Sequence, residues 1–213
     1  METGGIMSIR IYWIDVRTVD PDSPRVRALM SARRREKLDA LPLTDERNRS
    51  AAVELALALA VARERGTPLA PVLWAAQKGG KPYLPGGEMH FSLSHAADVA
   101  VCAVADQPVG VDVERARVLP RSLRRRLLSP AEADRPDDRL LWTWVAKESY
   151  LKMTGEGIVR PMTGFSAREG QISDAAGRPL ACVRTVDFPW PDYTLCVCAS
   201  EAEPTELIRL DSL

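Results

Sequence analysis

Apolar and polar side chains alternate in several short stretches, which is the pattern of strands that bury one face. In residues 8–16, for example, Ile9, Ile11 and Trp13 recur at every second position. Continuous apolar runs bounded by turn residues favour buried strands as well. On these two criteria we expect further strands at residues 89–94, 99–105, 109–114, 181–186 and 193–199.

Helical periodicity marks four other segments. Residues 26–41 and 120–128 have the pattern of basic helices, and residues 140–153 form a third helix with apolar cover. Thr44 is placed to cap a fourth helix that continues to Gly66. These helices alternate irregularly with the strands, which favours the α+β class over a regularly wound parallel sheet.

The charges of the chain balance, and this excludes some classes of function. The 213 residues contain 29 Lys and Arg and 29 Asp and Glu, so the formal net charge is zero and no global field draws the protein to nucleic acid or to a membrane. The longest apolar stretch, residues 51–62, falls far short of the ~20 residues of a membrane span. The first residues lack the pattern of a signal peptide. We therefore expect a soluble, cytoplasmic protein.

Cysteine and histidine are scarce. The four cysteines, at positions 102, 182, 196 and 198, have no C-x-x-C spacing, which favours free buried thiols in a reducing compartment over a disulfide scaffold. His90 and His95 are the only histidines, so a multi-histidine metal site is excluded. A hard cation held by carboxylates stays open.

The predicted strand at residues 109–114 places two carboxylates on one face. Because side chains alternate along a strand, its three valines point toward a core while Asp112 and Glu114 share the other face. The two carboxylates are then roughly 6.5–7 Å apart along the chain. They repel each other, and a divalent cation would stabilise the pair. Gly110, just before them, leaves room for a ligand to approach. A solvated edge face is the alternative interpretation.

The predicted helix at residues 140–153 carries a second acidic group. Trp144, Glu148 and Lys152 are spaced i, i+4 and i+8, so they share one stripe of the helix. One interpretation is an exposed Glu–Lys pair worth ~0.3–0.5 kcal/mol. In the other, Glu148 completes a three-carboxylate Mg²⁺ site, and Lys152 meets a phosphate bound to the same metal.

A glycine-rich loop at residues 78–87 precedes a strand that ends in Ser94 and His95. Lys81 in this loop is a cation suited to phosphate, and the Ser–His pair is available to a polar ligand. The pair also suggests a hydrolase, but no G-x-S-x-G elbow surrounds it. The basic run at residues 33–37 lacks the interleaved aromatic residues of a nucleic-acid platform.

Taken in order, these motifs resemble one family, the 4′-phosphopantetheinyl transferases of the surfactin-synthetase-activating type. The motifs are Gly-Lys-Pro at residues 80–82 with Phe-Ser-Leu-Ser-His at 91–95, Val-Gly-Val-Asp-Val-Glu at 109–114, and Trp-Val-Ala-Lys-Glu-Ser-Tyr-Leu-Lys at 144–152. The likeness extends from residues 33–37 to the last predicted strand. It implies transfer of the phosphopantetheine arm of coenzyme A to a serine of an acyl or peptidyl carrier protein, with adenosine 3′,5′-bisphosphate as the second product.

The same resemblance implies an α+β fold of two similar halves, residues 1–107 and 108–213. The halves would be related by a pseudo-twofold axis, with the active site in the cleft between them and a monomer as the functional unit. The sequence Val-Cys-Ala occurs at residues 101–103 and again at 197–199. This repetition fits an ancient duplication.

The resemblance also implies roles for residues of the acidic motifs. Asp112, Glu114 and Glu148 correspond to the Mg²⁺ ligands. Lys152, helped by Lys81, corresponds to the partner of the pyrophosphate. Glu148 is the candidate base for the carrier serine, either directly or through a metal-bound water.

The coenzyme A phosphates would be met by residues from both motif regions. Ser94 and His95 correspond to phosphate contacts, and Arg34, Lys37 and Arg49 fall near the family's position for the 3′-phosphate. The implied coenzyme A set is Arg34, Lys37, Arg49, Lys81, Ser94, His95, Asp112 and Lys152.

The implied partners are coenzyme A and an acyl or peptidyl carrier protein, in fatty-acid synthesis or in polyketide and nonribosomal peptide synthesis. An apolar patch beside the site would contact the carrier, and the expected residues are Leu119, Leu123, Leu127 and Leu128. Arg121 and residues 124–126 would attract an acidic carrier, or would simply be solvated. The alternative function is a non-catalytic module that binds coenzyme A or the carrier protein; the intact acidic residues count against it.

Overall fold

A computed structural model describes residues 8–42, 45–77, 79–87 and 89–213. Its first sheet has the strand order β11-β1-β5-β4, in which β1 pairs parallel with β11 and antiparallel with β5. The strands of this sheet are β1 (Ile9–Asp15), β4 (His90–Ala96), β5 (Val99–Ala105) and β11 (Thr205–Arg209).

The second sheet is antiparallel throughout and has the strand order β6-β10-β9-β8-β7. Its strands are β6 (Val109–Arg115), β7 (Phe165–Arg168), β8 (Gln171–Asp174), β9 (Pro179–Thr185) and β10 (Tyr193–Ala199). A separate hairpin, β2 (Ala75–Ala76) with β3 (Pro82–Tyr83), carries the glycine-rich loop.

The helices are α1 (Pro24–Ala28), α2 (Ala32–Ala40), α3 (Asp45–Arg65), α4 (Arg124–Leu127) and α5 (Leu140–Thr154). Short 3-10 turns lie at η1 (Val16–Thr18), η2 (Arg121–Leu123), η3 (Pro130–Glu132), η4 (Asp137–Arg139), η5 (Gly157–Val159) and η6 (Met162–Gly164). No helix in the described ranges is long and apolar enough to cross a membrane.

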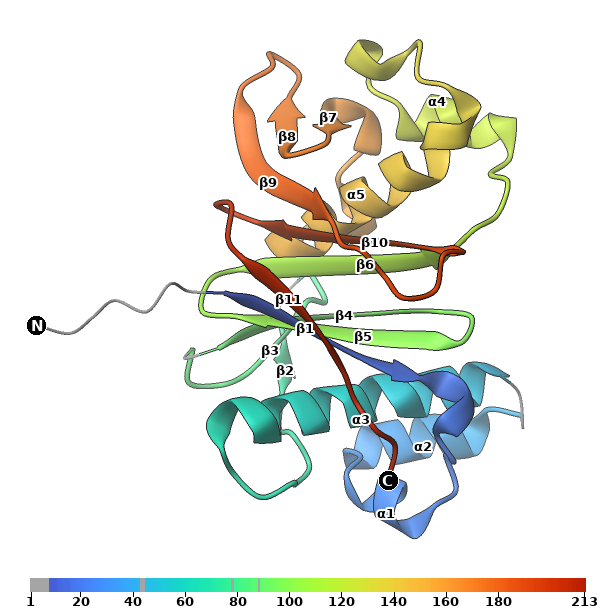
Figure 1. The fold of residues 1–213 in the computed structure, drawn as a ribbon, viewed down its shortest axis with the longest axis vertical. Coiled ribbons are helices and arrows are strands. Elements are labelled where there is room, and N and C mark those ends of the chain that lie inside the picture. The colour runs from blue at the N-terminus through green and yellow to red at the C-terminus, as the bar shows by residue number, and fades with distance from the viewer. Residues whose placement is uncertain (1–7, 43–44, 78, 88) are drawn as a thin grey trace, which may run out of the picture.

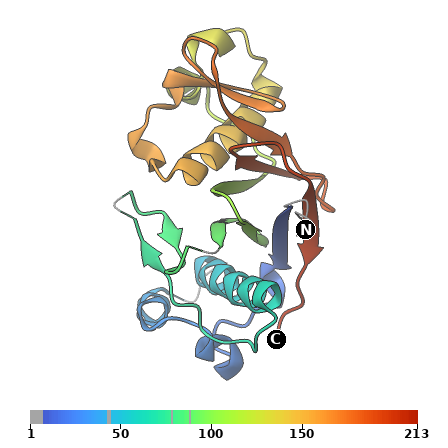
Figure 2. The same ribbon diagram turned by 90° about the vertical axis from the view of Figure 1, so that its left-hand side faces the viewer.

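The two sheets stack face to face between two helical layers (Figure 1). The valines of β6 and of β5 meet in a core between the sheets, which burial of apolar surface stabilises. On the outer faces, α3 packs against the first sheet and α5 against the second. A quarter turn about the vertical axis shows α5 on the second sheet above and α3 on the first sheet below (Figure 2).

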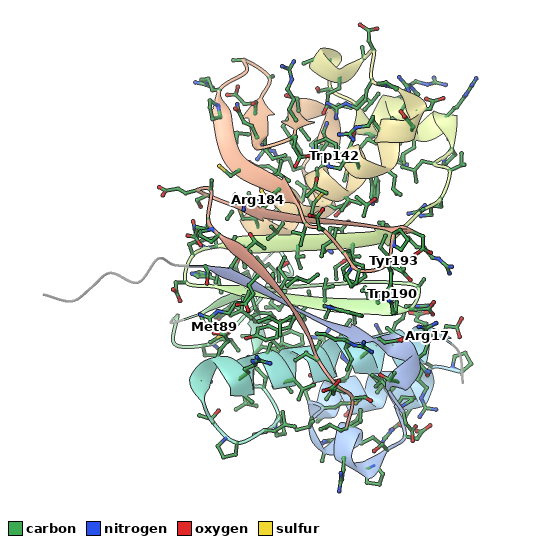
Figure 3. All side chains as sticks on the ribbon, in the orientation of Figure 1. Arg17, Met89, Trp142, Arg184, Trp190 and Tyr193 are labelled. Carbon is green, nitrogen blue, oxygen red and sulfur yellow. The ribbon has the colours of Figure 1, made fainter. Side chains whose placement is uncertain are left out.

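An aromatic cluster covers one end of the core between the sheets. The Trp13 ring packs edge-on against Phe188 and Trp190, and Tyr193 lies against Trp190 at 5.7 Å between ring centroids. The guanidinium of Arg17, from the first half of the chain, lies 5.0 Å from the Trp190 centroid (Figure 3). Cation–π attraction of this kind joins the two halves at their margin.

The α+β class is confirmed, and the predicted strands match β1, β4, β5, β6, β9 and β10 to within two residues. The basic helix expected at residues 26–41 is wrong in one respect, because the chain bends at the buried residues Leu29 and Met30. There Ser31 begins α2 by accepting a hydrogen bond from the Arg34 amide at 3.2 Å. The predicted capping residue of α3, Thr44, lies outside the described residues.

The last strand joins distant parts of the chain. Although β11 belongs to the part of the sequence expected to form the second half, it pairs with β1 in the first sheet. Figure 1 shows it leaving the second sheet and running beside β1 toward α1. The expected division at residue 107 therefore has to allow for a terminal segment that returns to the first half. All four cysteines are free, and three of them are buried.

Candidate functional site

The site is built where α5 lies directly on β6. A side chain at Gly110 would place a Cβ atom 1.9 Å from the Ser149 carbonyl oxygen and 2.4 Å from the Met153 nitrogen. Gly110 therefore allows the helix backbone to approach the strand. The expectation that it leaves room for a ligand is wrong, since α5 fills that space.

The predicted stripe on α5 is confirmed. Trp144, Glu148 and Lys152 are all partly exposed, whereas Val145 and Leu151 are fully buried. The stripe lies along the margin of the contact between α5 and β6, which brings Glu148 and Lys152 to the carboxylates of the strand.

Asp112 is the centre of the site. The residue is 6% exposed, and its Oδ1 accepts hydrogen bonds from Ser94 Oγ at 2.8 Å and from Lys152 Nζ at 2.7 Å. Lys152 Nζ also donates to Ser94 Oγ at 2.9 Å. The other oxygen, Asp112 Oδ2, is buried without a hydrogen-bond partner among the described residues. An unsatisfied buried carboxylate oxygen is costly, so this atom is suited to a ligand.

Two serine hydroxyls of β4 join the sheets beside Asp112. Ser92 Oγ accepts a hydrogen bond from the Val111 amide at 3.0 Å, and Ser94 Oγ accepts one from the Val113 amide at 3.3 Å. Because these bonds fix β4 to β6, they also hold the backbone on either side of Asp112. Ser94 thus has a local structural role in addition to any contact with a ligand.

Glu148 and Glu114 complete a negatively charged group around Asp112. Burial and then the negative charge of Asp112 raise the pKa of Glu148, and Glu114 adds to this while Lys152 opposes it. Glu114 accepts a hydrogen bond from the half-exposed Arg117 at 3.0 Å. Carboxylates that repel one another in this way are common at functional sites.

The carboxylate oxygens of Asp112, Glu114 and Glu148 are the type of ligand that a hard cation prefers. Mg²⁺ is bound through carboxylate oxygens and retained waters, and the unpartnered Oδ2 of Asp112 is a carboxylate oxygen that a cation would satisfy. In the conformation described, however, no three carboxylate, imidazole or thiol groups among the described residues converge into a ready-made cage. Lys152 instead neutralises Asp112 through Oδ1.

Several basic side chains act on His95, which follows Ser94 on β4. His95 is exposed at the end of β4, yet desolvation of the imidazole lowers its pKa, and the positive charges of Lys152, Arg49, Lys37 and Arg34 lower it further. The structure thus brings together the residues expected to meet the phosphates. Within this group Arg34 has partners of its own, which are the buried Glu54 at 3.1 Å and Ser50 at 2.8 Å.

Lys81 contacts the protein backbone of two elements. Its Nζ donates to the backbone carbonyls of Met153, at 2.6 Å, and Val109, at 3.1 Å. Burial lowers the pKa of this lysine to about 8. The ammonium is therefore attached to the end of α5 and the start of β6.

A cavity of about 290 Å³ lies between the glycine-rich loop and α5. The loop and the glycines after α5 form one wall, and Phe91, Leu93 and Leu151 supply an apolar lining. Glu148 and Lys152 also line it, so an elongated ligand in this cavity would have polar groups beside it.

Sequence reasoning missed a second lysine of the helix motif. Lys147 is fully buried, and its Nζ donates to Glu132 Oε2 at 2.5 Å and to the carbonyls of Leu127, Met162 and Phe165 at 2.7–2.8 Å. The signal that could have found it is its place in the apolar stripe of the helix, four residues before Leu151, where a charge needs a buried partner.

The expected leucine patch for a carrier protein is wrong. Leu119 and Leu127 are buried, and Leu123 and Leu128 pack against the same core as α5. These leucines therefore anchor the loop after β6, and they leave no exposed apolar surface of the kind expected. The nearby Arg124 is held by Asp137 at 2.5 Å.

Comparison with known proteins agrees with this geometry. The profile of the 4′-phosphopantetheinyl transferase superfamily matches residues 108–198, which contain β6, α5 and nearly all of β10. A 4′-phosphopantetheinyl transferase of Bacillus subtilis is 31% identical over 196 residues, covering 85% of this chain and 87% of that protein. The 4′-phosphopantetheinyl transferase Sfp of Bacillus subtilis strain 168 is 25% identical over 220 residues, covering 97% and 98% of the two chains.

The similarity therefore covers the whole site and almost the whole fold. The phosphopantetheinyl transferase HetI of Nostoc is 36% identical over 81 residues, a third of this chain. On the strength of the relatives that align along most of its length, the chain belongs to the 4′-phosphopantetheinyl transferases, enzymes that transfer an arm derived from coenzyme A to carrier proteins.

Proposed function

We propose that this enzyme transfers the 4′-phosphopantetheine arm of coenzyme A to a serine of an acyl or peptidyl carrier protein in a Mg²⁺-dependent reaction. In this step the serine oxygen forms a bond to the β-phosphorus, the bond from that phosphorus to the bridging oxygen breaks, and adenosine 3′,5′-bisphosphate leaves. The serine proton goes to a base of the enzyme. The observation that carries the proposal is the buried Asp112, bound to Lys152 through one oxygen and unpartnered at the other.

Asp112, Glu114 and Glu148 would hold the Mg²⁺ ion. When bound, the ion neutralises charge on the pyrophosphate oxygens. The unpartnered Oδ2 of Asp112 supports this assignment, and so does the repulsion from Asp112 and Glu114, which adds to burial in raising the pKa of Glu148. A cation at this position would relieve both.

Lys152 is the cation proposed to stabilise charge on the departing phosphate. Its ammonium is 2.7 Å from Asp112 Oδ1 and 2.9 Å from Ser94 Oγ, so it is oriented before any substrate arrives. A preorganised charge of this kind contributes because it needs no rearrangement when negative charge develops.

Glu148 is the proposed base for the carrier serine. Its raised pKa makes it a better proton acceptor than an ordinary carboxylate, and a positioned base is typically worth ~10²–10⁴ in rate. Its carboxylate accepts no hydrogen bond from the described residues. The same carboxylate is a proposed metal ligand, and the roles of base and ligand compete because a bound cation reduces basicity.

The phosphates of coenzyme A are proposed to lie against the basic group on β4, α2 and α3. Lys37 and Arg49 are available for the 3′-phosphate, since neither has an ion-pair partner within the described ranges. His95 and Ser94 would meet the pyrophosphate. The pKa of His95 supports this arrangement, because after desolvation it is lowered by the positive charges of Lys152, Arg49, Lys37 and Arg34.

The pseudo-twofold relation between the halves is also a proposal. Each half presents a sheet with one long helix on its outer face, α3 on the first and α5 on the second, and the cavity lies beside their junction. We propose a monomer divided near residue 107, with β11 returning to the first sheet, that serves fatty-acid, polyketide or nonribosomal peptide synthesis.

Intact mass spectrometry tests the transfer directly. An apo carrier protein is incubated with the enzyme, coenzyme A and Mg²⁺, in parallel with Asp112→Ala and Glu148→Ala variants. We expect the carrier to gain the mass of one phosphopantetheine arm with the wild-type enzyme only, and the gain to disappear when a chelator removes Mg²⁺. No gain across fatty-acid, polyketide and peptide carriers, with coenzyme A binding retained, would instead indicate a binding module without catalysis.

A further inference from the structure

The ammonium of Lys81 lies in a built position. It contacts two backbone carbonyls from elements that are far apart in sequence, Met153 at 2.6 Å and Val109 at 3.1 Å. The Met153 carbonyl belongs to the last turn of α5, where helix carbonyls lack partners within the helix and carry the negative end of the dipole. The Lys81 ammonium therefore donates a hydrogen bond to a carbonyl of the last turn and places a positive charge at the negative end of the helix dipole.

Glycines in the loop that carries Lys81 and at the end of α5 allow these two segments to pack closely. A Cβ atom at Gly79 would lie 2.1 Å from the Gly155 carbonyl oxygen. Gly155 ends α5 with a φ of 75°, and a Cβ there would lie 3.2 Å from Lys81 Cβ. The backbone of Gln77 closes the loop by donating to the Lys81 carbonyl at 2.9 Å.

This contact fixes the part of α5 that faces Asp112. Met153, whose carbonyl accepts from Lys81, directly follows Lys152. Lys152 bridges Ser94 and Asp112, and the cavity wall beside it is formed by the same loop. A movement of the last helical turn would therefore carry the Lys152 ammonium away from its partners.

We propose that Lys81 is a positioning residue, which holds the glycine-rich loop against the last turn of α5 and so keeps Lys152 facing Asp112. This inference rests on the proposed function, and it differs from the role of phosphate ligand that the family resemblance implies for Lys81. The half-buried ammonium already donates to two acceptors, and its lowered pKa reflects a position inside the protein.

The test compares variants that remove the contact in different ways. Lys81→Met removes the charge but keeps the aliphatic stem, whereas Gly79→Ala keeps the charge and separates the loop from Gly155. Calorimetry measures the affinity for coenzyme A without metal, and steady-state transfer gives kcat and KM. Thermal unfolding of each variant checks that it folds.

A positioning role predicts the same outcome for both variants. We expect kcat to fall about 10- to 100-fold, the loss that misplacement of a catalytic group by about 1 Å causes, with the dissociation constant of coenzyme A changed less than the rate. The double variant should lose no more than either single variant. In a Lys152→Met background, Lys81→Met should have little further effect.

A direct phosphate contact predicts the opposite pattern. Lys81→Met would then weaken coenzyme A binding, more at low than at high salt, and its effect would add to that of Gly79→Ala; either result would overturn the proposal. If Lys81→Met does not fold, Gly79→Ala decides alone, and wild-type kcat in that variant would contradict the proposal. Transfer by the wild-type enzyme, measured first, tests the proposed function separately from these ratios.

Discussion

The two sides of α5 each hold a lysine, and their surroundings differ in kind. On the side toward η3, Lys147 is fully buried and its Nζ is bonded to Glu132 and three carbonyls. On the side toward β4, Lys152 is partly exposed and shares Asp112 with Ser94, while the second oxygen of Asp112 has no partner among the described residues.

The charged groups of the Lys147–Glu132 pair are fully partnered within the protein, whereas those around Asp112 are not fully partnered by the described residues. Glu132 also accepts hydrogen bonds from the Ala167 amide at 2.7 Å and from Ser129, so neither its charge nor that of Lys147 needs anything from outside. Around Asp112, burial and then the negative charges of the neighbouring carboxylates raise the pKa of Glu148. A cluster of carboxylates that repel one another lowers stability, and clusters of this kind are typical of ligand-binding and catalytic sites.

Substitution of the carboxylates around Asp112 should have the largest effect on the transfer rate. We expect Asp112→Asn and Glu148→Gln each to reduce transfer about 10²–10⁴-fold. The free energy of unfolding should change little, because Glu148→Gln removes a like charge and Asp112→Asn removes the same repulsion together with the ion pair to Lys152. Transfer rates and urea unfolding measure both quantities. The matched control is Arg178→Ala, which breaks an exposed ion pair with Asp174 remote from α5. A large loss of stability in the acidic variants would contradict the comparison.

Lys147 should give the reverse result. Lys147→Met leaves the buried Glu132 with only the longer ion pair to Arg135, at 3.5 Å, and breaking a buried pair typically costs about 3–5 kcal/mol. Urea unfolding should show this loss, whereas Lys152→Met on the same helix should mainly reduce transfer. If the two lysine variants were equally destabilised, the distinction between the two sides would fail.

The close approach of α5 to β6 sharpens the comparison further. Gly110→Ala inserts a methyl group 1.9 Å from the Ser149 carbonyl oxygen, and overpacking of this kind costs about 1–3 kcal/mol. Because the helix would be pushed from Asp112, transfer should fall as well. Gly164→Ala is the control, since a Cβ there meets nothing within 4 Å; similar unfolding curves for both variants would be unexpected.

The dependence of stability on pH gives the smallest effect. Burial opposes ionisation of Glu132, but hydrogen bonds from Ala167, Lys147 and Ser129 lower its pKa below the ordinary value of 4.5. Its stabilisation is therefore fully present above pH 4.5 and is lost as the pH falls through the lowered pKa. In acid, unfolding of Glu132→Gln should show a slope shallower by at most about 1.4 kcal/mol per pH unit. Parallel slopes would show that the pKa of Glu132 is not lowered in the native state.

Much of the fold follows from local patterns. The alternation in residues 109–114 predicted correctly which side chains of β6 are buried in the core, because the strand has one face in the core between the sheets. The α5 stripe was predicted for the same reason. Residues 26–41 could not be predicted as two helices, since the bend depends on Leu29 and Met30 being buried in tertiary packing.

The contacts between distant segments could not be predicted. A glycine such as Gly110 shows that something approaches the backbone, but its position in the sequence does not say that the neighbour is α5. Likewise, the Leu119–Leu127 region looked like a surface because nothing local reveals the core that covers it. Lys81 shows the same limit, since its acceptors on Val109 and Met153 are distant in sequence.

The central claim is that the carboxylates around Asp112 form a site for a divalent cation. The most direct test follows the unfolding temperature of the wild-type and Asp112→Asn enzymes while Mg²⁺ is added in the presence of coenzyme A. A ligand at 100 times its dissociation constant stabilises the native state by about 2.7 kcal/mol, so the wild-type unfolding temperature should rise and that of the variant should stay constant. Equal shifts for both proteins, or none for the wild type, would contradict the claim.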